Sequence, residues 1–417
     1  MQDEYRSVSF KYGVLMLRTR RLLGVLDKLG TYRITKPLAW FMLYIMPVAA
    51  VAAFILLLGP IAILFSSQGP GLAQYIRSLT PLANLLLPGV NPYVPIVYGW
   101  IALIIGMVVH EASHGIVARS LGMPVKSAGL LFFLIVPIGA FVEVDDKVLK
   151  EARARDSGRV LAAGSGINLI VAVAALLLMI VAVSTMVPAT NGAGVSVVYT
   201  TPQGPTAAAA AGVSPGDFLL KMDNKPYLQA INDTAVYKPG NVVNVTIYRN
   251  GHTFTISNVT LGSRSFLDTR TNQTFTVAFF GVGVITSEGL QSTVSNYLQA
   301  FTRSPAPYVC IPTLPRCQDY VPFSDPLVGF YTSSLGPALP VVVNLLFWIY
   351  FVNFNLAIFN SLPIFPMDGG QAFEIGLRAL GRGKFSDELT SRVMALVTLS
   401  LVALLLIIIV GPYLFFR

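Results

Sequence analysis

The sequence predicts a polytopic α-helical membrane protein of about five to six spans, with a membrane re-entrant β-type segment and an inserted extracytoplasmic α+β domain. Two observations lead to this fold class. Hydrophobic residues make up 54% of the 417 residues and charged residues only 12%, whereas about a quarter of the residues in an average soluble domain are charged. Apolar runs long enough to cross a bilayer also recur along the chain, and one long polar region interrupts them.

The apolar runs predict five spanning helices, at 38–65, 95–119, 159–187, 336–362 and 391–416. A further apolar stretch, 128–144, contains glycine and proline and ends in Glu143. A re-entrant or hairpin segment fits it better than a spanning helix, and such backbone is tolerated only where protein or water satisfies it. The predicted parts are a cytoplasmic segment at 1–37 and the first helix with its outer loop at 38–94. The catalytic membrane core covers 95–187 and 336–375, on either side of an extracytoplasmic domain at 188–335. A cytoplasmic loop and the last helix follow at 376–417.

Lysine and arginine predict the orientation of these spans. They gather before the first span, after the second and after the fourth, whereas 188–335 carries few for its length. The positive-inside rule therefore places the N-terminus in the cytoplasm and 188–335 outside the cell membrane. The net charge of +9 then reflects topology, and no nucleic-acid partner is expected. No cleavable signal peptide is expected either, because the N-terminal segment lacks an uninterrupted apolar core.

The sequence His110-Glu111-Ala112-Ser113-His114 lies inside the second span and holds two of the three histidines of the chain. Histidines four residues apart share one helix face, so both imidazoles can bind one zinc ion, and the glutamate can act as general base toward a water. The alternative is a chance match. Ionisable groups near the centre of a bilayer cost about 3 kcal/mol, however, which favours a functional role.

A catalytic zinc ion usually takes three protein ligands and leaves one position open. His252 falls in the outer region and is excluded by the topology. Asp368 is the best candidate, since it follows the fourth span on the cytoplasmic side, after prolines that break the helix. A helix-capping or turn role for Asp368 is the alternative. Asp145 and Asp146 lie on the same side, but in a charged, solvated run.

The outer region predicts a small domain of short strands. An alanine-rich helical stretch at 206–211 precedes the turn Pro215-Gly216-Asp217 and a strand, and Asn250-Gly251 between alternating runs is a strong hairpin signal. This order resembles a PDZ domain of the bacterial protease type, which would bind a peptide end or strand at a sheet edge. A β-rich spacer without a ligand is the alternative. Residues 285–335 are expected to add a helix and a loop.

Two covalent features are expected in this outer region. Four N-x-[ST] sequons are candidate glycosylation sites, beginning at Asn232, Asn244, Asn258 and Asn272; frequent Asn and Thr in a polar β-rich domain would also explain them. Cys310 and Cys317 are the only cysteines. A disulfide between them could persist outside the cell, and two free thiols are the alternative.

Together the motifs resemble the site-2 protease family of intramembrane zinc metalloproteases, archaeal or bacterial members most of all. The resemblance covers 95–187 and 336–375 and rests on H-E-A-S-H-G, on Gly164-Ser165-Gly166-Ile167-Asn168, and on N-x-x-P-x-x-P-M-D-G-G from Asn360. A methionine stands where leucine is common before the aspartate, and some members have six spans. The resemblance implies His110, His114 and Asp368 as ligands of one catalytic Zn²⁺, and Glu111 as acid/base.

The resemblance also implies further site residues. Asn360 would act in catalysis, Asn168 would bind substrate or tie helices together, and 137–143 would be the re-entrant segment that supports the substrate, through Gly139, Phe141 and Glu143. The expected function is hydrolysis of peptide bonds within or near transmembrane helices of membrane-anchored substrates, as in regulated intramembrane proteolysis. The alternatives are a non-hydrolytic pseudoprotease or chaperone, a metal transporter and a PDZ-based scaffold. The natural substrate and the oligomeric state are not predicted.

Overall fold

The structure is a computed structural model that describes residues 8–11, 13–20, 23–79, 87–133, 136–202, 204–233, 235–268, 272–304, 306–309, 317, 329–381 and 385–415. It divides into two compact units. We call residues 1–177 with 345–417 the span unit, and residues 178–344 the inserted unit. The predicted outer region, 188–335, lies within the inserted unit, and the boundary between the units passes through two long helices.

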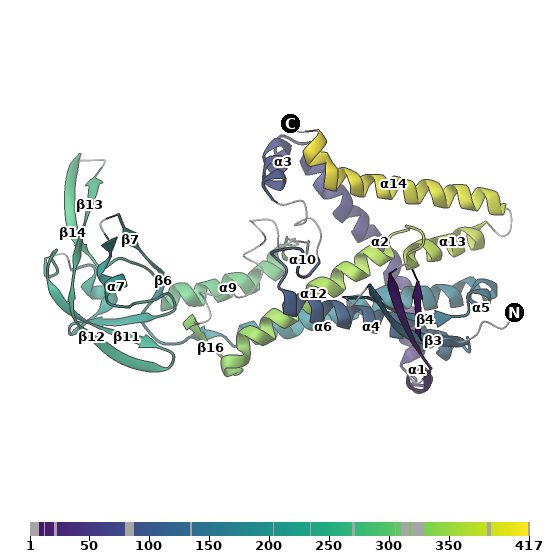
Figure 1. Ribbon diagram of the computed structural model, residues 1–417, viewed down its shortest axis with the longest axis horizontal. Helices are drawn as coiled ribbons and strands as arrows, with labels where there is room; N and C mark the ends of the chain where they lie inside the picture. Colours follow the sequence, from purple (N-terminus) through teal and green to yellow (C-terminus); the bar gives the residue numbers. More distant parts are fainter. Residues whose placement is uncertain are drawn as a thin grey trace. The chain divides into compact units, whose positions relative to one another are not determined.

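All five predicted spans are helices in the structure (Figure 1). Within the described residues, the helices long and apolar enough to cross a membrane are α2 (Thr35–Leu64), α4 (Ile96–Ser120), α6 (Ala154–Ser184), α12 (Leu339–Ser361, with a preceding 3-10 turn from Gly336) and α14 (Asp387–Leu414). Helix α14 starts four residues before its apolar run because the Ser386 side chain accepts a hydrogen bond from the Leu389 N–H. Shorter helices of the span unit are α1 (Leu23–Gly30), α3 (Gly69–Ser78), α5 (Asp146–Glu151) and α13 (Asp368–Leu380).

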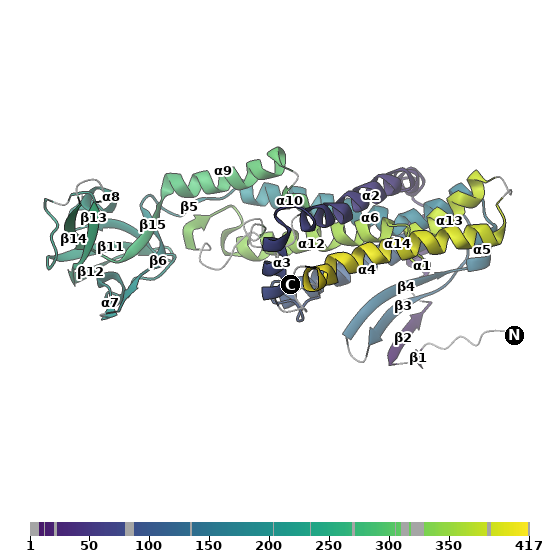
Figure 2. The ribbon, with the colours of Figure 1, turned by 90° about the horizontal axis from the view of Figure 1, so that it is seen from above.

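The segment expected to be a hairpin is part of a four-stranded antiparallel sheet, seen in Figure 2. Its strands, in spatial order, are β1 (Val8–Lys11), β2 (Val14–Thr19), β3 (Val125–Phe133) and β4 (Val136–Val144). Strand β4 ends this order and packs against α4. Gly129 permits the close pairing of β2 with β3, since a Cβ at this position would lie 2.0 Å from the Leu17 carbonyl oxygen.

The N-terminal hairpin β1–β2 adds strands that were not predicted for 1–37, which was expected only to be a cytoplasmic segment. Strand β2 pairs with β3 from Val14 opposite Phe133 to Thr19 opposite Ala128. The partner strand β3 lies more than one hundred residues later in the chain. The local sequence of 8–19 therefore does not reveal that a strand edge is available for pairing. The physical reason is that the unpaired N–H and C=O groups at the edge of β3 can bond any strand that the tertiary fold places beside them.

The inserted unit is built on a sheet whose strands follow the order β12, β11, β9, β6, β15. They cover His252–Thr260, Val242–Arg249, Phe218–Met222, Ala193–Val198 and Val282–Thr286, respectively. Strands β13 (Gly262–Asp268) and β14 (Gln273–Phe279) form a separate hairpin. The other elements are β5 (Val187–Pro188), β7 (Thr200–Thr201), β8 (Gly204–Pro205), β10 (Lys225–Pro226), β16 (Tyr331–Thr332), α7 (Ala207–Ala210), α8 (Tyr227–Ala230), α9 (Ser287–Arg303) and α10 (Ala306–Val309).

Local turn chemistry explains much of this unit. Asn250 and Gly251 both have positive φ angles, 50° and 87°, and join β11 to β12 as the expected two-residue hairpin. The Thr206 side chain caps α7 by accepting a hydrogen bond from the Ala209 N–H. An apolar core, with Val195, Leu219 and Ile247 fully buried, then holds the sheet against its short helices.

The covalent features lie on described residues only in part. The four sequon asparagines are exposed: Asn232, Asn244, Asn258 and Asn272. Cys317 is buried and disulfide-bonded, and Cys310 lies outside the described residues.

Candidate metal centre

Helix α4 presents His110 and His114 on one face, and both Nε2 atoms meet the same carboxylate oxygen. The Oδ2 atom of Asp368 lies 3.0 Å from His110 Nε2 and 3.2 Å from His114 Nε2. Both histidines are buried, with 8% of each residue exposed, and they lie on a helix long and apolar enough to cross a membrane. The three ligand atoms all lie within 4.8 Å of one another, so two elements far apart in the sequence converge on one point.

Asp368 reaches the histidines from a tight connection between α12 and α13. That helix ends at Ser361, and α13 begins at Asp368 itself. Two glycines allow the first turn of α13 to sit against the end of α12: a Cβ at Gly369 would lie 2.4 Å from the Ser361 oxygen, and one at Gly370 would lie 2.5 Å from the Ile364 oxygen. Asp368 therefore begins a helix, but its carboxylate faces the two imidazoles instead of serving as a cap.

Helix α6 forms another wall of the site. The Val160 carbonyl lies 2.7 Å from His114 Nδ1, and a carbonyl can only accept, so Nδ1 carries the proton and Nε2 is free to bind a metal. The Asn168 amide nitrogen lies 3.1 Å from His110 Nδ1. Backbone or amide partners of this kind orient metal-binding histidines in many proteins.

The residues fit a zinc ion. Zinc binds histidine nitrogen at about 2.0–2.1 Å and carboxylate oxygen at about 2.0–2.2 Å, which puts neighbouring ligand atoms about 3.3 Å apart in a tetrahedron. The two measured nitrogen-to-oxygen distances, 3.0 and 3.2 Å, are close to this value. Two histidines and one carboxylate leave a fourth position for water or substrate, as catalytic zinc sites do.

Asp368 can offer a metal ion an anionic ligand oxygen. Burial by itself raises the pKa of Asp368, but the imidazoles of His114 and His110 outweigh that effect and hold the pKa below its ordinary value. An anionic oxygen thus faces two nitrogen ligands in a site that is largely closed to solvent.

Glu111 is held by the sheet. Its Oε2 atom accepts a hydrogen bond of 3.0 Å from the backbone N–H of Val142 in β4. This bond orients the carboxylate that follows the first histidine on α4, and it joins the spanning helix to the last strand of the sheet. The candidate general base and the strand edge are therefore neighbours.

The other predicted site residues lie close by in the fold, with different contacts. Gly139, Phe141 and Glu143 all belong to β4, and Glu143 accepts a 2.6 Å hydrogen bond from Ser127. Asn360 lies half-buried in the last turn of α12. Asn168 is fully buried and contacts His110; this contact links α6 to α4, in line with the expected role of tying helices together.

Two other residues considered as the third metal ligand, Asp145 and His252, do not join the histidine pair in the described structure. Asp145 caps α5 by accepting from the Lys147 and Val148 N–H groups, and it pairs with Lys126 at 3.1 Å. His252 belongs to β12 of the inserted unit and is not a member of the described cluster of metal-binding groups.

Three contributors were missed by sequence reasoning. The Val142 N–H and the Val160 carbonyl are backbone groups, so their residue type carries no signal. Gly164 was noticed as part of a motif but not as a site residue. A Cβ at Gly164 would lie 2.4 Å from both His110 Nε2 and His114 Nε2. The glycine of the G-x-x-x-N motif was the one sequence signal that could have indicated this close approach of α6 to the histidines.

Comparison with known proteins agrees with this geometry. The sequence pattern of peptidase family M50 matches residues 98–407, which is more than half of the chain. An uncharacterized protein of Methanocaldococcus jannaschii is 35% identical over 156 residues, 37% of this chain and 40% of that protein. A Nostoc sp. protein provisionally named a zinc metalloprotease is 22% identical over 324 residues, 67% of this chain and 84% of that one. The chain thus spans less than half the length of the M. jannaschii protein that it matches.

Proposed function

The chain belongs to peptidase family M50, the site-2 protease family, and on that premise we propose that it is an intramembrane zinc metalloprotease. It hydrolyses peptide bonds within or near the transmembrane helices of membrane-anchored substrates, as in regulated intramembrane proteolysis. One observation carries the proposal: His110, His114 and Asp368 converge within 4.8 Å, and Glu111 lies beside the first histidine on a helix that can cross a membrane.

Each side chain has a defined task in this reaction. A zinc ion, when bound, supplies an acidified water and polarises the scissile carbonyl. Glu111 accepts a proton from the attacking water at its carboxylate and returns it to the leaving amide nitrogen. The Val142 N–H keeps this carboxylate in place. His110, His114 and Asp368 hold the ion, and one ion suffices for the three ligands.

The substrate is proposed to bind as an added strand. Peptide bonds in a helix are closed off by their own hydrogen bonds, so the helix must unwind before hydrolysis. Strand β4 is the last in its sheet, and its Val142 N–H points to Glu111 rather than to β3. Backbone groups of alternate residues share one edge of a strand, so the Ala140 N–H points to the same open edge of β4 as the Val142 N–H. A stretch of unwound substrate paired with this edge of β4 would lie beside the carboxylate of Glu111.

Proline at position 140 tests this binding mode. Ala140→Pro removes one donor from the open edge of β4 and leaves the Val142 N–H intact, and prolines are tolerated on edge strands. We expect KM for a transmembrane substrate to rise by up to about 10-fold, the effect of losing one net backbone hydrogen bond. An unchanged KM, with normal expression and thermal stability, would argue against strand pairing at this edge.

Hydrolysis itself is tested with Glu111→Gln, which keeps the size of the side chain and removes its basicity. Purified wild type should cleave a transmembrane substrate in detergent, and a zinc chelator should stop it. The variant should bind zinc equally and lose at least about 100-fold in kcat, the lower range for a general base. Cleavage by neither protein, across several substrates and with one zinc bound per chain, would favour a pseudoprotease or chaperone.

Residues 188–335 of the inserted unit are proposed to lie outside the cell and the N-terminus in the cytoplasm. The distribution of lysine and arginine supports this orientation, and the exposed sequons of the inserted unit are compatible with it. A short epitope placed in the Asn250-Gly251 turn should be detected by antibody on intact cells. Detection only after permeabilisation would reverse the topology.

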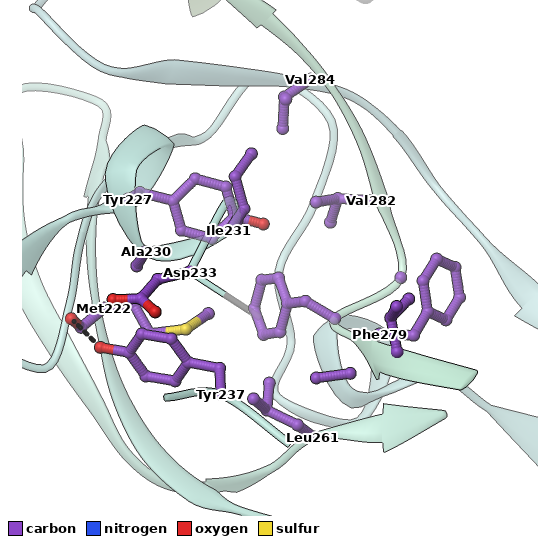
Figure 3. A pocket seen from close by; sticks show the side chains of 14 residues that line it. Met222, Tyr227, Ala230, Ile231, Asp233, Tyr237, Leu261, Phe279, Val282 and Val284 are labelled. Atoms are coloured by element: carbon purple, nitrogen blue, oxygen red, sulfur yellow. Dashed lines mark hydrogen bonds between the residues drawn. The ribbon is translucent and has the colours of Figure 1, made fainter. Parts of the chain in front are cut away.

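A peptide is the proposed ligand of the inserted unit, in line with its predicted PDZ-like character. A cavity of about 220 Å³ lies in this unit, lined by residues from α8, β14 and β15 among others, and Figure 3 shows the side chains around it. Tyr227 and Ile231 line it from one side, Val282 and Val284 from the other. Strand β15 ends the described sheet order, so an extended peptide could pair with its edge and place an apolar side chain in the cavity.

Ile231→Asp tests this second binding site, since Ile231 is 42% exposed and tolerates a polar replacement. We expect it to weaken binding of extended peptides with apolar ends at least about 10-fold, as burying an unpaired carboxylate is costly. Val236→Asp, also exposed and absent from the cavity lining, is the matched control. Equal affinities for the three proteins would leave the cavity without a peptide role.

A further inference from the structure

We propose that one stripe of helix α6 determines the metal site: Gly164 keeps the space in front of both histidines clear, and Asn168 holds His110 with Nε2 toward the ion. The inference deepens the proposed function and rests on it. Val160, Gly164 and Asn168 are spaced four residues apart on α6, so they share one face of the helix. All three face the imidazoles of α4.

Gly164 is the closest approach of α6 to the site. A Cβ at this residue would lie 2.4 Å from His110 Nε2, 2.4 Å from His114 Nε2 and 2.5 Å from His110 Cε1. These distances are far inside van der Waals contact, and the nitrogens concerned are those that face Asp368. A methyl group would therefore occupy the space that the two histidines share and would push them apart. No flexible side chain is present to yield, because both rings are buried.

Asn168 is a positioning residue rather than a substrate-binding one. It is 0% exposed, so a substrate does not reach it. Its Nδ2 atom lies 3.1 Å from His110 Nδ1, and its Oδ1 atom has no hydrogen-bond partner among the described residues. A half-turn about the Cβ–Cγ bond exchanges these two atoms. It places the free Oδ1 at Nδ1, where it accepts the proton that zinc binding through Nε2 requires.

The two histidines are thus supported in different ways. The Val160 carbonyl only accepts a hydrogen bond, so it fixes the proton of His114 on Nδ1. The Asn168 amide both donates and accepts, so it can pair with His110 in either tautomer. His110 therefore depends on a side chain that mutation can remove, whereas the partner of His114 is backbone and persists in any variant.

Metal content distinguishes this role of Gly164 from simple helix packing. We expect Gly164→Ala to purify with less than about one tenth of the zinc of wild type and to lose the visible absorption of cobalt bound in place of zinc. Gly166→Ala is the matched control: it makes the same change on the same helix, but the new Cβ would meet the Met42 side chain, 2.4 Å away at Cγ. This variant should retain both zinc and the cobalt spectrum.

Asn168 variants provide the second arm, which stays informative if Gly164→Ala does not fold. Asn168→Leu keeps the branched shape of the side chain and removes the hydrogen bond, so zinc affinity measured by chelator competition should fall about 10–100-fold, as for other outer partners of ligating histidines. Asn168→Asp supplies an acceptor and should restore most of that affinity. Thermal unfolding of each purified variant reports folding separately.

The outcomes separate the inference from the proposed function. Wild-type zinc binding and cleavage, together with unchanged zinc affinity in Gly164→Ala or in Asn168→Leu, would overturn the role assigned to α6 and leave the protease proposal standing. Wild type that binds no zinc would overturn both. Loss of zinc in Gly164→Ala and Asn168→Leu, with retention in Gly166→Ala and rescue by Asn168→Asp, is the expected result.

Discussion

The span unit and the inserted unit use buried polar groups differently. In the described part of the inserted unit, the buried polar residues are Thr206 and Asp217, and both are paired within the protein. Thr206 bonds the Tyr199 carbonyl and caps α7, and Asp217 binds Arg249 through two oxygens at 2.5 and 2.6 Å. In the span unit, by contrast, His110 and His114 turn their Nε2 atoms to one carboxylate oxygen.

This contrast separates polar burial that stabilises a fold from polar burial that prepares a site. In a closed pair such as Asp217 with Arg249, the buried carboxylate is satisfied by its hydrogen bonds within the protein. The histidine cluster concentrates ligand atoms within 4.8 Å and leaves Asn168 Oδ1 unpaired. Buried polar groups in a membrane span are costly, so their convergence at one point indicates function.

The largest effect should come from the cluster. Asp368→Asn exchanges an anionic ligand for a neutral amide that binds zinc poorly, and we expect metal affinity to fall by more than the roughly 100-fold that loss of an outer contact can cost. Peptidase activity should disappear with the metal, while thermal unfolding of the inserted unit stays unchanged. Zinc content by elemental analysis checks the first point, and full zinc occupancy in this variant would remove Asp368 from the ligand set.

The next effect should come from the closed pair. Asp217→Ala leaves the Arg249 guanidinium without its carboxylate in a partly buried position, and breaking such a pair costs about 3–5 kcal/mol. We expect the inserted unit of the full chain to become sensitive to limited proteolysis at a lower temperature. Zinc content should not change, and a parallel loss of zinc would show that the metal site depends on the fold of the inserted unit.

A smaller effect should follow from the link between sheet and base. Val142→Pro removes the N–H that holds Glu111, and a hydrogen bond to a charged group contributes about 1.5–3 kcal/mol, or roughly 10–100-fold in rate. The loss should appear in kcat with zinc content unchanged, whereas Ala140→Pro should act on KM. Identical kinetic effects of the two prolines would mean that the strand acts only as a scaffold.

The smallest effect belongs to the inserted unit. Tyr237 donates its hydroxyl to the Met222 carbonyl at 3.2 Å beside the cavity of Figure 3. Tyr237→Phe keeps the buried ring and removes the hydrogen bonds of the hydroxyl to the Met222 carbonyl and the Asp223 side chain, so the free energy of unfolding should fall by about 1 kcal/mol. Thermal unfolding of the full chain measures it. A loss as large as that of Asp217→Ala would show that these hydroxyl contacts carry more of the fold than their chemistry implies.

Local chemistry allowed the sequence by itself to determine the spans, the Asn250-Gly251 hairpin and the spacing of His110 and His114. Each depends on neighbours in the chain: apolar length, turn conformation and helix periodicity are properties of a few consecutive residues. Asp368 could also be predicted as the third ligand from the sequence. Few carboxylates follow a predicted span on the cytoplasmic side, where the histidines were expected. The convergence of Asp368 with the histidines came from the structure.

The tertiary structure alone decided which groups support that site. The contact of Glu111 with Val142 spans 31 residues, that of His114 with Val160 spans 46, and that of Asn168 with His110 spans 58. The N-terminal hairpin found its partner strand over a still longer separation. Such contacts depend on how helices and strands meet in space, and two of them use backbone groups that every residue type possesses, so no local pattern in the sequence encodes them.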